Sequence, residues 1–88
     1  MPRFITVHTG SETIGAILSM NEDIALMNTP QGYTLVRIDP SSDAGGIIPQ
    51  EALRIDLSGP APVFMDTDTG LPKENPVLTS LLLSVVHP

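Results

Sequence analysis

The feature that most limits the possible folds is the stretch between Arg3 and Pro30, RFITVHTGSETIGAILSMNEDIALMNTP. Arg3–Thr9 is rich in β-branched residues, and Thr13–Met20 carries apolar side chains at every second position. Both patterns are typical of strands. Gly10 falls in the turn between them. Gly15 falls inside the second strand, where a glycine marks a sharp bend or a close backbone approach. The stretch predicts the first half of a small, strongly bent β-barrel.

Further strands are expected along the chain. Ile24–Asn28 follows the polar turn Asn21–Asp23 and is predicted to be the third strand. The fourth is expected over Tyr33–Asp39. Ala52–Ser58 alternates apolar and polar residues most regularly and is the fifth. A short edge strand is expected at Val63–Met65. The predicted fold class is therefore all-β: a five-stranded, SH3-like barrel.

The apolar C-terminal tail fits two structures. Asn75 followed by Pro76 is a typical helix start, with asparagine as the cap and proline in the first turn. The apolar face of that helix would comprise Val77, Leu78, Leu81, Leu82 and Val85. A strand would instead carry Leu81, Leu83 and Val85 on one side. We favour the helix, and expect one domain overall: a barrel over residues 1–66 with a turn and tail appended over residues 67–88.

The composition indicates a small acidic domain. The 88 residues include no cysteine, and ten acidic side chains against four basic ones give a net charge of −6. A chain of this length buries only about 60% of its unfolded surface, so it depends on a small barrel core or on help from neighbouring subunits. Its negative charge repels phosphate backbones. No run is apolar enough for a membrane span or a signal peptide. We expect a protein of the bacterial or infected-host cytoplasm, without a membrane partner.

The motifs that could indicate catalysis are weak. Asp68-Thr69-Gly70 matches the triplet of aspartic proteases, but little of the chain follows it and Thr67 stands where an apolar residue belongs. Asp66-x-Asp68-x-Gly70 is similar to the start of a calcium loop, but Val77 occupies the position of the essential glutamate. His8 has no second histidine nearby, and no serine has a histidine at motif spacing. We predict no enzyme activity, catalytic residue, metal or cofactor.

One family shares the pattern of glycines and strands. The spacing Gly10, four residues, Gly15, then an alternating strand, a polar turn and an apolar strand resembles the first motif of Sm-like proteins, the LSm and Hfq group. HTGSETIGAILSMNEDIALMNTP is similar to the short Sm-like proteins of bacterial and marine viruses. The resemblance extends from Arg3 to Leu57. It implies a bent barrel that assembles into homo-oligomeric rings, with Tyr33–Asp39 of one subunit pairing with Ala52–Ser58 of the next.

The resemblance also implies single-stranded RNA binding. Asn21 stands in the turn where the family places its RNA-contacting asparagine. If the fourth and fifth strands line a ring, Tyr33 could stack on a base while Arg37 and Arg54 meet phosphate. The alternative has Tyr33 at a subunit interface, with the two arginines paired to acidic neighbours.

The chain departs from the family where RNA would bind. The turn that begins with Asn21 is acidic, and Gly45–Pro49 lacks the arginine that is usual there. We therefore expect a non-enzymatic, homo-oligomeric binding or assembly module, with RNA binding implied by resemblance. The alternative is an acidic adaptor or inhibitor of viral origin that docks on a host protein.

Overall fold

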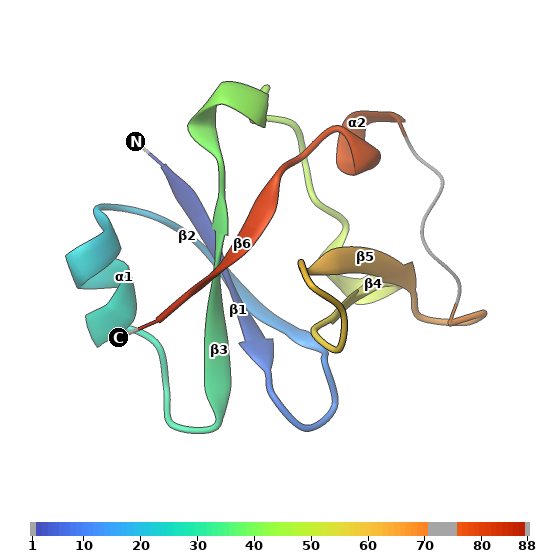
Figure 1. Ribbon diagram of the computed structural model, residues 1–88, viewed down its shortest axis with the longest axis horizontal. Coiled ribbons are helices and arrows are strands. Elements are labelled where there is room, and N and C mark those ends of the chain that lie inside the picture. Colours follow the sequence, from blue (N-terminus) through green and yellow to red (C-terminus); the bar gives the residue numbers. More distant parts are fainter. Residues whose placement is uncertain (1, 71–75, 88) are drawn as a thin grey trace.

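The computed structural model describes residues 2–70 and 76–87, and within these residues the fold is mostly β, as predicted (Figure 1). The six strands of this part of the chain are β1 (Arg3–His8), β2 (Ile14–Ser19), β3 (Tyr33–Ile38), β4 (Leu53–Asp56), β5 (Val63–Asp66) and β6 (Leu83–Val86). The connections include α1 (Glu22–Met27), α2 (Pro76–Thr79) and the 3-10 turns Pro40–Ser42 and Gln50–Ala52.

The strands form two sheets rather than the single five-stranded barrel that the sequence predicted. The larger sheet has the order β2-β1-β3-β6 and is antiparallel throughout. The smaller one pairs β4 with β5. The turn between β1 and β2 joins them, because Ile55 donates a backbone hydrogen bond to the carbonyl of Glu12 (3.0 Å).

The two strands that the sequence predicted to pair between subunits each have partners along both edges. β3 lies between β1 and β6. Along the outer edge of β4, the carbonyl of Glu12 accepts a hydrogen bond from the N–H of Ile55. The carboxylate of Glu12 also accepts one from the backbone N–H of Leu57 (2.6 Å). Neither Tyr33–Asp39 nor Ala52–Ser58 therefore has a free strand edge with which to pair with a neighbouring subunit.

Gly15 forms a β-bulge in β2. Thr6 lies opposite Ala16, but Val7 lies opposite Ile14, so Gly15 is the extra residue. A Cβ at this position would lie 2.7 Å from Cε2 of Tyr33 and 2.9 Å from Oγ1 of Thr6. The prediction of a bend or a close approach at Gly15 is confirmed, and the approaching group is an aromatic ring.

The two faces of the larger sheet pack against different layers. Alternate side chains of β1 and β3 point to opposite faces. One face carries Ile5 and Val36, which pack with Leu53, Ile55 and Phe64 of the smaller sheet. The other face carries Phe4 and Leu35, which pack with Ala25 of α1. The molecule is thus layered, with the larger sheet between α1 and the smaller sheet.

The predicted third strand, Ile24–Asn28, is wrong: these residues fall in α1 and at its C-terminal end. A run of four apolar residues fits both a strand and a helix, and here the helix buries Ala25 while Met27 stays 84% exposed. Two acidic residues in the first turn suit the positive end of the helix dipole.

The tail contains elements of both predicted alternatives. Pro76 begins α2, which ends at Thr79, whereas Asn75 lies outside the described residues. The long helix is wrong, because Leu83–Val86 forms β6 and pairs with β3. Leu81 and Leu83 pack together on the main core, as the strand alternative predicted. Leu83–Val86 is therefore a strand of the larger sheet.

Candidate binding surface

A groove of about 490 Å³ runs beside Tyr33. Its walls are the loop Thr29–Gly32, the start of β3 and the end of β6, together with Leu26 of α1. None of the residues that line it is Asp, Glu, Lys or Arg. Figure 1 shows why these parts meet: the C-terminal end of the chain runs back beside α1 and the loop that leads into β3. The groove combines apolar side chains, such as Leu26 and Val86, with polar ones, such as Thr29, Gln31 and His87.

Tyr33 has a fixed orientation in this groove. Its half-buried ring meets the ring of His8 edge to face, with centroids 5.3 Å apart and an interplanar angle of 88°. The bulge at Gly15 leaves room for the ring. Thr9 and Thr34 share a hydroxyl hydrogen bond (3.0 Å) next to it. One flank of the ring is therefore held by the protein, while the residue also lines the groove.

The other predicted site residues lie elsewhere. Arg37 is on the same face of β3 as Tyr33 but about 13 Å further along the strand. Arg54 is in the smaller sheet, opposite Met65. Asn21 precedes α1 and is exposed, and its side chain makes no capping hydrogen bond. The structure does not bring the four residues into one site.

Arg37 and Arg54 each lie close to a carboxylate. The pKa of Asp39 is lowered mainly because the backbone N–H and hydroxyl of Ser41 donate hydrogen bonds to it, with a smaller contribution from the charge of Arg37. The pKa of Asp56 is lowered mainly by the equivalent bonds from Ser58, and to a lesser extent by Arg54. The charges of Arg37 and Arg54 are thus the smallest of the effects that lower these two pKa values.

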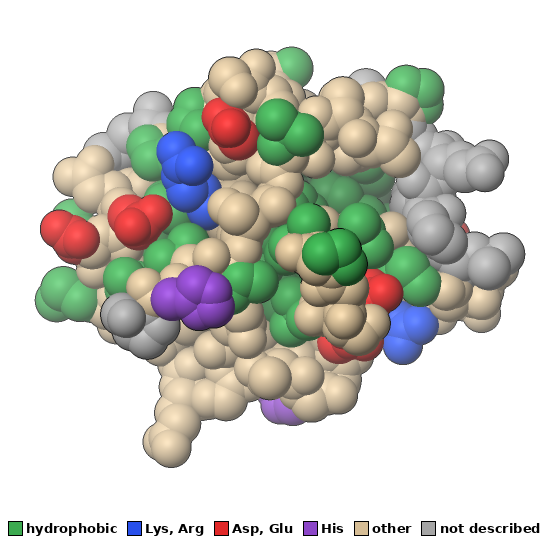
Figure 2. All heavy atoms as spheres, in the orientation of Figure 1, with side chains coloured by type: hydrophobic (Ala, Val, Ile, Leu, Met, Phe, Trp, Pro, Cys, Tyr) green, Lys and Arg blue, Asp and Glu red, His purple; other side chains and the backbone are tan. Residues whose placement is uncertain are grey.

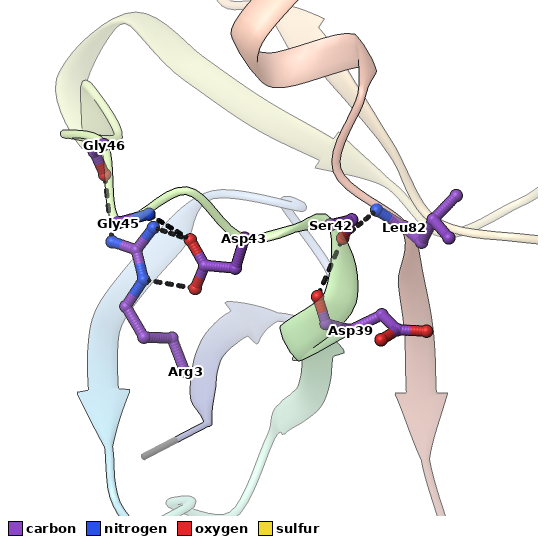
Figure 3. Close-up of polar contacts among 7 residues, drawn as sticks. All are labelled: Arg3, Asp39, Ser42, Asp43, Gly45, Gly46 and Leu82. Atoms are coloured by element: carbon purple, nitrogen blue, oxygen red, sulfur yellow. Dashed lines mark hydrogen bonds and ion pairs between the residues drawn. The ribbon is translucent and has the colours of Figure 1, made fainter.

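Arg3 is the third arginine and is fully engaged within the protein (Figure 3). Its Nε and Nη2 donate to the two carboxylate oxygens of Asp43 at 2.7 and 2.5 Å, and its Nη1 donates to the carbonyl of Gly46 at 3.0 Å. This hydrogen-bonded ion pair lowers the pKa of Asp43 and raises that of Arg3. The pair attaches the loop after β3 to the start of β1.

His8 and Ser11 are a pair that the sequence analysis missed. The hydroxyl of Ser11 lies 3.0 Å from Nδ1 of His8, because the tight turn after β1 folds these residues together. However, the backbone N–H of Ser11 already donates to the same nitrogen at 3.1 Å. That lone pair is therefore not available to activate the serine, and the pair serves to close the turn. A His-x-x-Ser spacing in a predicted hairpin turn was the available signal.

The acidic motif after β5 also forms a turn. The Asp66 carboxylate accepts hydrogen bonds from the backbone N–H groups of Asp68 (2.9 Å) and Thr69 (3.2 Å), and Gly70 has a φ of 69°. Across residues 2–70 and 76–87, no cluster of three or more His, Asp or Glu side chains is placed to hold a metal ion. In the same residues, no helix has the length and apolar character needed to cross a membrane.

Comparison of this chain with protein-family models, with curated proteins and with solved structures finds no match.

Proposed function

We propose that this protein is a non-enzymatic binding module whose ligand is a segment of another protein, as in an adaptor or inhibitor that docks on a host protein. The observation that carries this proposal is the uncharged groove beside Tyr33 in a chain with a net charge of −6. Apolar grooves with a few polar groups at the rim are typical of ligand sites. The surrounding negative charge would attract a partner segment that carries Lys or Arg.

The charges of the described residues favour a protein ligand over RNA. Phosphate contacts need Arg or Lys side chains that are free to reach them. Arg3 is held by Asp43, while Arg37 and Arg54 lie beside Asp39 and Asp56. None of the three lines the groove.

Single-stranded RNA is the second candidate, and one observation favours it. Tyr33, the residue that the Sm-like resemblance offers for base stacking, lines the groove and is held at one flank by His8. A base could stack on such a ring without contact to an arginine. This second proposal, of RNA binding, also includes membership of the Sm-like family and assembly into rings. Self-association would have to use strand edges other than those of β3.

Two binding measurements on the folded protein test the choice. Phage display of random peptides should enrich sequences with Lys or Arg next to apolar residues. Fluorescence anisotropy with labelled oligo(U) and oligo(A) at low salt should show no binding. Tyr33→Ala should weaken the selected peptides about tenfold, whereas Asn21→Ala, which does not line the groove, should leave them unchanged. Salt-sensitive binding of oligo(U) with no enriched peptide would reverse the assignment.

A further inference from the structure

The outer edge of β6 carries unpaired backbone groups. The N–H of Asp39 bonds to the carbonyl of Leu82 (2.8 Å), and hydrogen-bonded pairs alternate along an antiparallel ladder. Ser84 is therefore the next residue that bonds to β3. The N–H and C=O groups of Leu83 and Val85 point away from β3, toward the edge, where the described residues offer no strand partner.

This edge lacks the features by which proteins usually block strand addition. Natural edge strands carry charged residues, proline or bulges that prevent pairing with another chain. β6 is Leu-Ser-Val-Val, and its pairing with β3 has no register shift. By contrast, the edge strand at the other end of the sheet, β2, contains the bulge at Gly15. The edge of β6 is thus suited to a further strand.

Two apolar hollows lie along β6 on the side of β5. The first, of about 190 Å³, lies between Leu83 and residues of β5 and α2, including Phe64 and Leu78. The second, of about 320 Å³, lies between Val85 and the loop Gly59–Pro62. Figure 2 shows apolar side chains gathered over this loop, β5 and α2, with charged side chains around them. Leu83 and Val85 are two residues apart, which is the spacing of side chains on one face of a strand.

The charges indicate what kind of strand would bind. No Asp, Glu, Lys or Arg lines either hollow. Asp39 and Asp56 are partly exposed residues next to Leu82 and Leu57, at the margins of this surface, and hydrogen bonds from Ser41 and Ser58 lower the pKa values of their carboxyl groups. Arg37 and Arg54 offset them locally, so the net charge of −6 sets the long-range attraction. A second copy of the chain would be repelled, whereas a basic segment would be attracted.

We propose that β6 binds an extended basic peptide of a partner protein by strand addition, with alternate apolar side chains of the peptide in the two hollows. This inference rests on the proposed protein-binding function and assigns to it a second surface, on the β5 side of β6 rather than beside Tyr33. Backbone hydrogen bonds to Leu83 and Val85 supply register, and the hollows supply selectivity. The peptide residues between these apolar ones lie outside the hollows, and where they are Lys or Arg they are attracted by the net negative charge of the domain.

The test uses synthetic peptides and two variants of the whole chain. The probe is a peptide that alternates Lys and Val, and the controls are an alternating Glu–Val peptide and a Lys–Val peptide whose valines are contiguous. Val85→Pro removes an N–H that points to the free edge and leaves the ladder to β3 intact. Val85→Ala keeps this N–H and is the matched control. Circular dichroism and thermal melting establish that both variants fold.

The alternating Lys–Val peptide should bind more tightly than either control peptide, and should shift the Leu83 and Val85 amide signals in NMR spectra. Val85→Pro should weaken it about tenfold or more, and Val85→Ala clearly less. N-methylation of the peptide amides that would hydrogen-bond to β6 should weaken binding as much as Val85→Pro does. The N-methylated peptide therefore provides the same test if the Val85→Pro variant does not fold.

Each of the following results would overturn the inference. Equal binding of the alternating and contiguous peptides, or binding unaffected by N-methylation, would exclude strand addition. Concentration-dependent protection of the Leu83 and Val85 amides without peptide would mean that a second copy covers the edge. Display-selected peptides that bind only beside Tyr33 would leave the proposed function standing while refuting this mode. If no peptide binds at all, both proposals fail.

Discussion

Replacing Gly15 tests whether the bulge in β2 exists to accommodate Tyr33. In Gly15→Ala, the new methyl group would lie 2.7 Å from Cε2 of Tyr33 and 2.9 Å from Oγ1 of Thr6. Real Cβ atoms do not approach other atoms so closely, so the ring or the strand must move. Overpacking of this kind costs about 1–3 kcal/mol.

The expected net change is smaller than the overpacking cost. Replacing glycine by alanine reduces the freedom of the unfolded chain, which stabilises the fold by about 0.4–1 kcal/mol where the backbone is compatible. We therefore expect Gly15→Ala to lower the free energy of unfolding by about 1–2 kcal/mol, judged from the centres of these two ranges, about 2 and about 0.7 kcal/mol. In a domain of this size, this corresponds to a Tm lower by roughly 4–16 °C.

Urea unfolding of five proteins measures this effect: the wild type, Gly15→Ala, Gly10→Ala, Tyr33→Ala and the double variant of Gly15 and Tyr33. Gly10→Ala is the matched control, because its Cβ would lie 3.4 Å from the nearest atom of His8, and its stability should change by less than about 0.5 kcal/mol. Adding Tyr33→Ala removes the ring from the clash, so the double variant should recover about 1 kcal/mol relative to the sum of the single changes. A Gly15→Ala protein as stable as the wild type, or additive effects in the double variant, would refute the close-approach explanation.

Two other contacts between distant segments give further predictions. Asp43→Asn breaks the two-bonded ion pair with Arg3 and, since the pair lies near the surface, should cost about 1–2 kcal/mol in urea unfolding at pH 7. Because folding lowers the pKa of Asp43, its stabilisation is present above the unfolded value near 3.8 and is lost as the pH falls through the folded value. Acid titration followed by circular dichroism should thus show a smaller loss for Asp43→Asn than for the wild type, and identical acid curves would contradict it. Glu12→Ala should cost about 1–2 kcal/mol, since the backbone N–H of Leu57 loses its acceptor, whereas Glu12→Gln retains one and should cost less; equal costs would show that the bond to Leu57 contributes nothing.

The sequence predicted those strands whose patterns are purely local. Thr13–Met20 and Ala52–Ser58 alternate clearly, and the structure has β2 and β4 within them. Tyr33–Asp39 likewise contains β3. The turn at Gly10 and the close approach at Gly15 followed from the properties of glycine itself. For the strands and the turn, the residues that set the structure are neighbours along the chain.

The errors arose where distant segments decide the outcome. A run such as Ile24–Met27 fits either secondary structure until it is known that Ala25 must cover Phe4 and Leu35. The tail becomes a strand only because β3 offers it an edge. Its apolar content alone does not distinguish this from a helix.

The candidate site was predicted in part for the same reason. Tyr33 lines a groove, but the groove is assembled from α1, β3 and β6, which are far apart in the sequence. The acidic neighbours of Arg37 and Arg54 were visible in the sequence, because each lies two residues further along the chain. The arrangement of these groups relative to Tyr33 depends on the sheet order, and no local pattern encodes it.

Amide hydrogen exchange of β6 in the free protein, measured by NMR, tests the open strand edge most directly. The N–H of Ser84 bonds to β3, whereas those of Leu83 and Val85 face the edge. We expect the Leu83 and Val85 amides to exchange on the order of tenfold faster than that of Ser84, at every protein concentration. Equally slow exchange at all three residues would contradict the account, because it would mean that another strand already occupies this edge.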